Sequence, residues 1–545
     1  MKRREFIEKS GQLAGAFFLP NFPNALQKLA PPQNEPERKL APEKKPDPRI
    51  SFATSDSQYQ STYSRALDVL SRNIAAVSDY SPPVLIEGSS YRGIWQECAP
   101  QESLVYSVVR PDIARNNHLA FFALQHEDGQ LPCWLRTTGV GFGQIQMVVP
   151  IAATVWELSQ ETGDSELLEK AYSSCSRWDA WLRRYRNTRG TGLCEGFCTY
   201  DTGHDNSPRW SGVPTRCPDA DARKCPPLPS MPRLCPDLSA TVYGARVALA
   251  AMARALGKPS EAERWLDDAA TIRSAIMAKL YSAEDAAFFD LDAQDHLVRI
   301  RGDVISRVLG EHVVDQQLFE TIYQRQIHSP AAFWAPYPLA SIALDDPSFV
   351  RPIPRNSWGG ASQALTALRA PRWMEHYSKP ADLAHLMQQW VSAILRTRAI
   401  LQESSFLQQM DPLTGMFTHD AGDYSPTALV FMDFTWRLSG VRQIQSGLEW
   451  NVRPPAHVHA SYRLRLASAR TAELRYTSGR AALFLNDKLL YRTSDTVRLI
   501  TDPEGKLQEA AGIAAKTTRV VLRHVSGRER KFSLAPNSSI SLKDG

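Results

Sequence analysis

Asp205 lies in a short turn-forming run, residues 200–210 (YDTGHDNSPRW), where a glycine and a proline mark the turn. Tyr200 and Trp210 flank the run with aromatic rings. Cleavage of a glycosidic bond needs a carboxyl group held rigidly on a loop, beside surfaces on which sugar rings can lie. The alternative is an Asx-turn, in which Asp205 only caps a neighbouring backbone amide.

Helical periodicity dominates the chain from about residue 61 to residue 440, and Gly or Pro follows several of the apolar runs. The predicted helices are Tyr63–Val77, Val148–Leu158, Leu167–Arg183, Ala240–Leu256, Glu261–Leu280, Ala361–Leu368, Ala381–Ile400 and Thr427–Leu438. Many helices with little strand signal between them indicate an all-α body of paired hairpins, assigned to residues 50–445.

The pattern changes to short alternating runs rich in β-forming residues from about residue 446 to the end of the chain. Examples are residues 462–466 (YRLRL), 481–485 (AALFL), 519–522 (RVVL) and 540–542 (ISL). About a hundred residues of this kind predict a C-terminal β-sandwich domain. The region has no cluster of titratable groups, so its expected role is to pack against the helical body.

Length and composition are those of a folded protein with two or three domains, since the chain has 545 residues, 43% hydrophobic and 22% charged. The net charge of +5 is small, and the basic residues are scattered, which gives no reason to expect a nucleic-acid partner. No apolar run is long enough to span a membrane. Nothing in the sequence indicates a particular oligomeric state.

The N-terminus has the features of an export signal. Two adjacent arginines, Arg3 and Arg4, precede a weakly apolar stretch, residues 13–19, as in the twin-arginine signals that export folded proteins. Residues 1–30 are therefore interpreted as the signal, and the proline-rich, charged residues 31–49 as a solvated linker. We expect a periplasmic or secreted protein.

All eight cysteines lie between Cys98 and Cys235. An even number in an exported protein favours disulfides, here pinning the proline-rich loop that carries Cys217, Cys225 and Cys235. A zinc site or free thiols are the alternatives, although the spacings lack the paired short repeats of structural zinc modules.

Several motifs occur in the same order as in a known superfamily. They are residues 202–208 (TGHDNSP), 236–243 (PDLSATVY), 288–292 (FFDLD), 356–360 (NSWGG), and 410–415 (MDPLTG) followed by 424–428 (YSPTA). Over residues 90–440 the chain resembles the (α/α)6-toroid, or six-hairpin, glycosidases, which include family 63 glycosidases, trehalases and mannosylglycerate-hydrolase-like proteins. The resemblance implies a mainly α fold, an (α/α)6 toroid followed by the β-sandwich, and a carbohydrate substrate.

The resemblance also implies the catalytic residues. Asp205 matches the general acid, and Gln408 stands where the family has its catalytic base. A glutamine side chain cannot accept a proton at neutral pH, although it can hold a water molecule. Three interpretations stay open: another carboxylate, Glu403, Glu97 or Glu102, acts as base; the protein is an epimerase or lyase on the same fold; or it binds glycans without cleaving them.

Other residues are expected to shape the sugar site. Residues 92–103 (RGIWQECAPQES) resemble the Trp-x-Arg-Asp segment of the first sugar subsite, with the Arg-Asp pair replaced. The expected substrate-binding residues are Trp95, Glu97, Glu102, His204, Trp210, Asp237, Trp358 and Tyr424; Gln144 and Gln146 lie near matching loops. For Trp95 the alternative is a buried core residue, and for His204 an ordinary loop histidine. The leading hypothesis is an inverting hydrolase of an α-linked saccharide or glycosylglycerate, which requires no metal or other cofactor because two carboxyl groups suffice.

Overall fold

The computed structural model describes residues 48–401, 406–418, 422–466 and 469–543. The residues from Pro48 onward form one compact unit. The expected export signal, nearly all of the expected linker, and Glu403 lie outside the described residues. Within the described residues, no helix is both long and apolar enough to cross a membrane.

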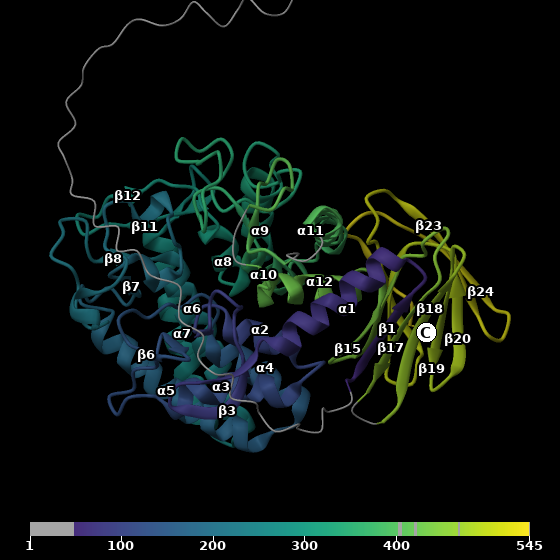
Figure 1. Ribbon diagram of the computed structural model, residues 1–545, viewed down its shortest axis with the longest axis horizontal. Helices are drawn as coiled ribbons and strands as arrows, with labels where there is room; N and C mark the ends of the chain where they lie inside the picture. Colours follow the sequence, from purple (N-terminus) through teal and green to yellow (C-terminus); the bar gives the residue numbers. More distant parts are fainter. Residues whose placement is uncertain (1–47, 402–405, 419–421, 467–468, 544–545) are drawn as a thin grey trace, which may run out of the picture. The chain divides into compact units, whose positions relative to one another are not determined.

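Twelve α-helices occupy the described residues between Ser57 and Ser439, which confirms the predicted helical part of the chain. They are α1 (Ser57–Arg72), α2 (Ala99–Tyr106), α3 (Pro111–Ala123), α4 (Ile151–Thr162), α5 (Ser165–Tyr185), α6 (Pro236–Ala255), α7 (Pro259–Lys279), α8 (Val304–Gly310), α9 (Gln316–Ile322), α10 (Ala364–Met374), α11 (Pro380–Leu401) and α12 (Ser425–Ser439). Figure 1 shows them in purple to green.

The even-numbered helices contact one another in chain order. α2 packs against α4, α4 against α6, α6 against α8, α8 against α10, and α10 against α12, and α12 in turn contacts α2. Most odd-numbered helices pack against an even-numbered neighbour, α3 on α2, α5 on α4, α7 on α6 and α11 on α10, while α1 packs on α12. Each such pair is a helical hairpin or its equivalent across the ends of the helical part.

The first helix ends earlier than predicted. α1 ends at Arg72, and Ile74–Val77, expected to be helical, forms the strand β2, which pairs with β3 (Tyr80–Leu85). The turn between the strands contains Asp79 with φ 60°, a left-handed conformation that ends the helical path. Ile74 and Val77 are β-branched and fit a strand well, so local strand pairing outweighs the helical spacing.

Short strands lie between the helices and position their connecting loops. They are β4 (Gly93–Trp95), β5 (Trp134–Arg136), β6 (Gly139–Gly141), β7 (Glu195–Gly196), β8 (Arg233–Leu234), β9 (Tyr281–Ser282), β10 (Ala287–Phe288), β11 (Asp290–Leu291), β12 (Leu297–Val298), β13 (Ser362–Gln363) and β14 (Gln409–Met410). They form small sheets, in the orders β4-β5-β6, β12-β11-β8-β7, β10-β9 and β13-β14. The helical part is thus less purely α than the periodicity indicated.

The C-terminal part is rich in strands, as predicted, and contains two antiparallel sheets. One has the order β1-β17-β18-β19-β20-β23-β24 and the other β15-β16-β21-β22-β25. The strands are β1 (Ile50–Thr54), β15 (Val441–Ile444), β16 (Gly447–Val452), β17 (Ala460–Arg465), β18 (Thr471–Thr477), β19 (Arg480–Leu485), β20 (Lys488–Thr493), β21 (Val497–Thr501), β22 (Leu507–Ala511), β23 (Thr518–His524), β24 (Glu529–Leu534) and β25 (Ser539–Ser541).

The strand-rich part shares its packing with the helices. All six residues of β16 are buried, because one face meets core side chains of the sheets and helix α12 contacts the strand. At the N-terminal end, β1 pairs with β17, so residues 50–54 complete the larger sheet although they precede the helices. Arg498 of β21 also donates to Glu375, which follows α10. Strands from the two ends of the described chain therefore belong to the same sheet.

Candidate active site

The loop that carries Asp205 is built from two short 3-10 helices, Thr199–Thr202 and Pro208–Trp210, joined through Gly203. Gly203 adopts a left-handed conformation with φ 61°. A side chain there would overlap Glu97, because an added Cβ would lie 1.7 Å from Glu97 Oε2. The glycine is thus required by both the turn and the close approach of a second carboxyl group.

Asp205 is held by a residue from a distant loop. Asn356 Nδ2 donates to Asp205 Oδ2 at 2.8 Å, and the backbone N–H of Trp358 donates to the Asp205 carbonyl at 3.0 Å. Burial raises the pKa of Asp205 to about 6, although the hydrogen bond from Asn356 lowers it. The residue as a whole is nevertheless partly exposed.

Asp201 has the capping role that the Asx-turn alternative gave to Asp205. Its carboxylate accepts from the backbone N–H groups of Ile145, Phe197 and Cys198, and from the guanidinium of Arg186. The side chains of Asp201 and Arg186 are both fully buried. Asp201 therefore fixes the start of the loop, which leaves Asp205 free to face the site.

A buried network of ion pairs and hydrogen bonds stabilises the loop that carries Asp205. Arg209 makes paired hydrogen bonds to Asp237 at 2.7 and 2.8 Å and to Asp290 at 2.7 and 2.6 Å. Arg307 donates to the Thr202 carbonyl at 2.6 Å. Burial by itself would raise the pKa of Asp237, but the charge and hydrogen bonds of Arg209 outweigh it and lower the pKa to about 2. Asp237 is thus an ionised partner that positions the loop, and its predicted contact with substrate stays a prediction.

His204 belongs to the same network. Its Nε2 lies 2.6 Å from Asp303 Oδ1, and its ring meets Trp358 edge-on at 5.1 Å between centroids. Burial and the positive charge of Arg307 lower the pKa of His204 to about 4. The imidazole is therefore neutral at neutral pH and bonds Asp303 as a hydrogen-bond partner rather than as an ion pair.

Gln408 does not act on Asp205 directly but through Asn356. Gln408 Nε2 donates to Asn356 Oδ1 at 3.0 Å, and Tyr91 donates its hydroxyl to Gln408 Oε1 at 3.3 Å. A chain of polar contacts thus runs from Tyr91 through Gln408 and Asn356 to Asp205. At the position where the family pattern places a base, this protein has Gln408, which orients Asn356, the hydrogen-bond partner of Asp205.

Three further carboxyl groups surround this region. Glu97 is partly exposed and accepts from Gln146 Nε2 at 3.2 Å, whereas Glu87 and Glu102 are buried. Glu87 accepts from the Tyr424 hydroxyl at 2.7 Å, and neither oxygen of Glu102 has a hydrogen-bond partner within the described residues. Of the three, only Glu97 is a partly exposed residue, as Asp205 is.

Burial and mutual repulsion raise the pKa values of these groups. Burial, together with the charges of Glu87 and Asp205, raises the pKa of Glu97 to about 8. Burial and the charge of Glu102 raise the pKa of Glu87 to about 8, and burial does the same for Glu102. Closely placed carboxyl groups cannot all ionise, so the cluster retains protons at neutral pH.

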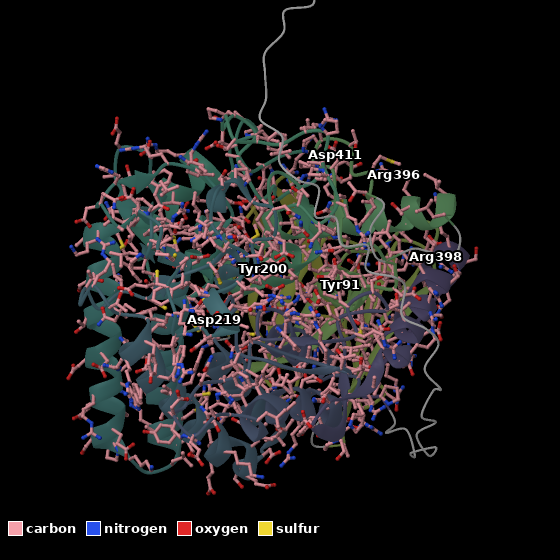
Figure 2. The ribbon with its side chains drawn as sticks, turned by 60° about the vertical axis from the view of Figure 1, so that its left-hand side comes forward. Tyr91, Tyr200, Asp219, Arg396, Arg398 and Asp411 are labelled. Carbon is pink, nitrogen blue, oxygen red and sulfur yellow. The ribbon has the colours of Figure 1, made fainter. Side chains whose placement is uncertain are left out.

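Aromatic rings line the same region. Trp95 and Trp358 share a small buried cluster with Cys98 and Leu365. Tyr91 lies at the edge of that cluster, with its ring 6.2 Å from both Trp95 and Tyr424. Figure 2 labels Tyr91 and Tyr200 near the middle of its view, and both are partly exposed. These two tyrosines are therefore the rings best placed to meet a sugar.

Trp210, which the sequence analysis assigned to substrate binding, points into the protein. It is 3% exposed and donates its indole N–H to Thr202 Oγ1 at 2.9 Å. In this structure its hydrogen bond to Thr202 stabilises the loop that carries Asp205. Trp95, Trp358 and Tyr424 are buried as well, and their predicted contacts with substrate stay predictions.

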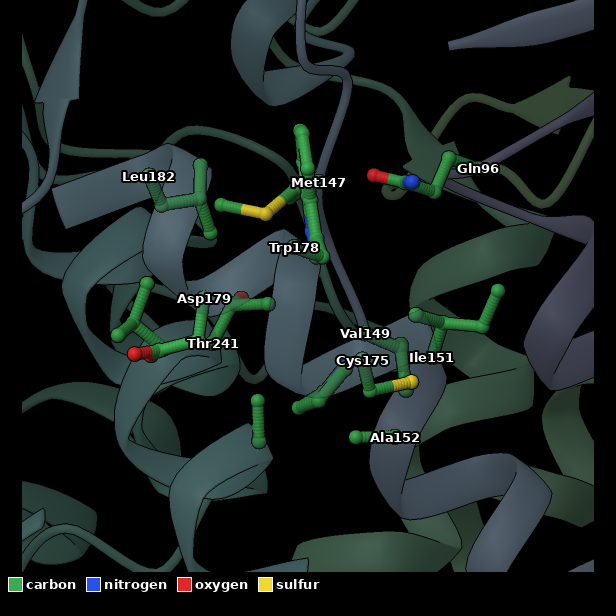
Figure 3. A pocket seen from close by; sticks show the side chains of 13 residues that line it. Gln96, Met147, Val149, Ile151, Ala152, Cys175, Trp178, Asp179, Leu182 and Thr241 are labelled. Carbon is green, nitrogen blue, oxygen red and sulfur yellow. The ribbon is translucent and has the colours of Figure 1, made fainter. Parts of the chain in front are cut away.

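A small cavity lies beside the site, between α4, α5 and α6 (Figure 3). Gln96, Met147, Trp178 and Thr241 are among its lining residues, and both polar atoms of the Gln96 amide lack a partner within the described residues. Its volume of about 20 Å³ is that of roughly one water molecule, too small for a sugar ring.

The cysteines are all free in the structure, and seven of the eight are buried. The predicted disulfides are therefore not seen. The sulfur atoms of Cys198 and Cys217 lie 3.6 Å apart, in contact but without a bond.

Several residues of the site were not found from the sequence. Asn356 and Tyr91 lie inside or next to quoted motifs, so their position in the motif was a usable signal. No recognised motif contains Glu87, Asp303 or Arg307, and only the fold brings these residues close to the loop that carries Asp205.

Comparison with known proteins identifies the family of the part of the chain that contains this site. The model of the mannosylglycerate hydrolase MGH1-like glycoside hydrolase domain matches residues 92–436. No curated protein sequence matches the chain.

Three solved structures illustrate the shared fold. A family 63 mannosylglycerate hydrolase from Thermus thermophilus is 19% identical, with a TM-score of 0.56 over 69% of this chain and 100% of that chain. The neutral trehalase Nth1 from Saccharomyces cerevisiae is 13% identical, with a TM-score of 0.51 over 68% and 79%. An α-L-rhamnosidase from Dictyoglumus thermophilum is 14% identical, with a TM-score of 0.53 over 81% and 44%.

Proposed function

Because this chain belongs to the family of mannosylglycerate hydrolase MGH1-like glycoside hydrolase domains and is a glycosidase, we propose that it hydrolyses an α-linked saccharide or a glycosylglycerate with inversion at the anomeric carbon. Asp205 acts as general acid, as the sequence resemblance implies. Glu97 acts as general base in place of the glutamine at position 408.

The observation that carries this assignment is the presence of two partly exposed acidic residues, Glu97 and Asp205, in one region. Glu97 lies against Gly203, two residues before Asp205, and the charge of Asp205 raises the pKa of Glu97. Of the two described alternatives, Glu102 is fully buried and Glu97 is partly exposed, so Glu97 is the better supported of these two.

In the proposed reaction, the Asp205 carboxyl group gives its proton to the glycosidic oxygen as the bond to the anomeric carbon breaks. The Glu97 carboxylate takes a proton from a water molecule, whose oxygen attacks the anomeric carbon from the opposite face. Glu97 ends protonated and Asp205 ionised, and proton exchange with solvent restores the pair. Gln146 orients Glu97, and Asn356 orients Asp205.

Two further features belong to the same proposal. The closed order of contacts among the even-numbered helices supports an (α/α)6 toroid with its loops gathered around Asp205. The N-terminal sequence supports export to the periplasm or the medium.

The test is release of free sugar from a panel of α-linked disaccharides and glycosylglycerates by the purified full-length protein. On the substrate found, Asp205→Asn is expected to lower kcat by about 100-fold or more while ligand binding persists, because an amide cannot donate the required proton. Glu161→Gln, at the exposed end of α4, is the matched control and should keep full activity.

Full activity of the Asp205→Asn variant would refute the acid assignment. Saccharide binding with no free sugar released over long incubation would instead favour a glycan-binding protein. A product that keeps its carbon skeleton but changes a stereocentre or gains a double bond would favour an epimerase or lyase.

A further inference from the structure

Cys198 and Cys217 form a contact that the proposed hydrolysis does not use. Their sulfur atoms are 3.6 Å apart, and the residues are 0% and 3% exposed. This is the separation of two thiols in van der Waals contact, since a disulfide bond measures about 2.05 Å. A small rotation of both side chains would bring the sulfurs within bonding distance.

The backbone on either side of the pair is already aligned. Thr199 N–H donates to the Pro214 carbonyl at 3.0 Å, and Tyr200 N–H donates to the Thr215 carbonyl at 3.1 Å. The two chain segments therefore run side by side directly next to the cysteines. Disulfides need such neighbouring backbones, because their Cα atoms must lie within about 7 Å.

A metal ion is a poor occupant for these sulfurs. Asp201 is the third residue whose ligand atom lies close to them, but its carboxylate already accepts three backbone N–H groups and the Arg186 guanidinium. Arg186 Nη2 also lies 3.6 Å from Cys217 Sγ. A positive guanidinium beside the sulfur repels a cation, whereas a disulfide carries no charge.

The position of the pair gives it a consequence for the site. Cys198 immediately precedes the first 3-10 helix of the Asp205 loop, and Cys217 directly follows the largely exposed residues 211–216. A bond between them would close a ring of chain that contains Asp205 and Tyr200. Closing such a ring removes conformational freedom from the unfolded chain and from the loop.

We propose that Cys198 and Cys217 form a disulfide in an oxidising compartment, and that this bond fastens the loop that carries Asp205. Each thiol loses its proton, and the two electrons pass to a disulfide oxidant. With oxidised glutathione, the sulfurs join and two molecules of reduced glutathione leave. Because the sulfurs are buried in the folded protein, the bond forms while the chain folds.

The first test counts thiols by mass spectrometry. The full-length protein is refolded in a glutathione redox buffer, denatured without reductant, and treated with iodoacetamide. Of the eight cysteines, two fewer should be alkylated than after reduction. Trypsin should then release a linked pair of peptides, residues 190–209 and residues 217–223, which separates on reduction.

Variants identify the partners. Residues 190–209 also contain Cys194, so Cys194→Ser should keep the linked peptides while Cys198→Ser removes them. Cys225→Ser should keep them as well, although Cys225 packs against the pair. The oxidised protein should unfold at a higher temperature than the reduced protein. That difference should persist in the Cys194→Ser variant and vanish in the Cys217→Ser variant.

Alkylation of all eight cysteines after oxidative refolding would overturn the proposal, as would a link from Cys217 to Cys225. Zinc that co-purifies and is released with two thiols would also overturn it, because a metal would then occupy the pair. The mass measurement on the unaltered protein decides these outcomes even if a serine variant does not fold.

Discussion

Three residues of the site differ in charge from the pattern of the family that the sequence resembles. Gln408 replaces the expected catalytic glutamate, and Glu97 and Cys98 replace the Arg-Asp pair of the Trp-x-Arg-Asp segment. The carboxylate expected at position 408 is thus absent, and the carboxylate of the second loop is one position earlier in the segment. The hydrogen bonds explain how each change is accommodated, because Gln408 supports Asn356 and Gln146 supports Glu97.

The two carboxyl groups predict the pH dependence of turnover. The pKa of Asp205 is raised to about 6 and that of Glu97 to about 8. Below pH 6 both groups hold protons and no base is present; above pH 8 both are ionised and no acid is present. We therefore expect kcat/KM to rise as pH passes 6 and to fall as it passes 8, in a bell-shaped profile. A profile flat from pH 5 to pH 9 would contradict the pair.

The order of these pKa values decides where the single proton resides. Because Glu97 has the higher pKa, the free protein at pH 7 holds the proton mainly on Glu97, so the reactive form with protonated Asp205 is the minor one. Substrates with a good leaving group distinguish the roles. Such substrates should restore activity to the variant that lacks the acid, and much less to the variant that lacks the base.

Residue chemistry was predictable where it was carried by a motif. The turn around Asp205 and the order of motifs predict it as the acid, a role that stays a prediction, and the structure gives it a raised pKa and a hydrogen-bond partner. The roles of Asp201 and Arg307 were not predictable, because hydrogen bonds to a backbone carbonyl or amide leave no pattern in the sequence. His204 was ambiguous, since its neutral state depends on burial beside Arg307.

At the level of elements, buried contacts of Arg209 stabilise the loop that carries Asp205. Arg209 contacts Asp237 at the start of α6 and Asp290 in β11. Arg209→Met should leave two buried carboxylates without their main partner, which costs about 3–5 kcal/mol. Urea unfolding at pH 7 measures the loss. Arg223→Met, which removes an exposed ion pair with Asp221, is the control and should cost less than about 1 kcal/mol. Equal losses of unfolding free energy in the two variants would contradict a stabilising role for the buried contacts of Arg209.

The helices themselves were largely predictable, and the small strands between them were not. Long amphipathic runs such as Leu167–Arg183 have a clear period, and α5 covers that range. A two-residue strand such as β8 has no period to detect, and its pairing with β7 depends on the fold around it. Strand β2 was likewise not predicted, because its residues have helical spacing and become a strand only by pairing with β3.

At the level of the whole molecule, the helical and strand-rich parts depend on each other. Leu448, Trp450 and Val452 of β16 are buried in a strand that α12 contacts, and β1 pairs with β17. A chain ending at Gly440 should therefore expose large apolar side chains, each worth about 1.5–3 kcal/mol when buried, and fail to give soluble protein. A chain starting at Pro48 is the control and should fold. A soluble, active fragment ending at Gly440 would show that the sheets are dispensable.

If Glu97 has replaced the base absent from position 408, the turnover of the variants Glu97→Gln and Glu97→Gln/Gln408→Glu should show it. On the substrate cleaved by the unaltered protein, we predict that Glu97→Gln lowers kcat by about 100-fold or more. The added Gln408→Glu change should restore part of that loss by returning a carboxylate beside Asn356. A Glu97→Gln variant as active as the unaltered protein would contradict the account.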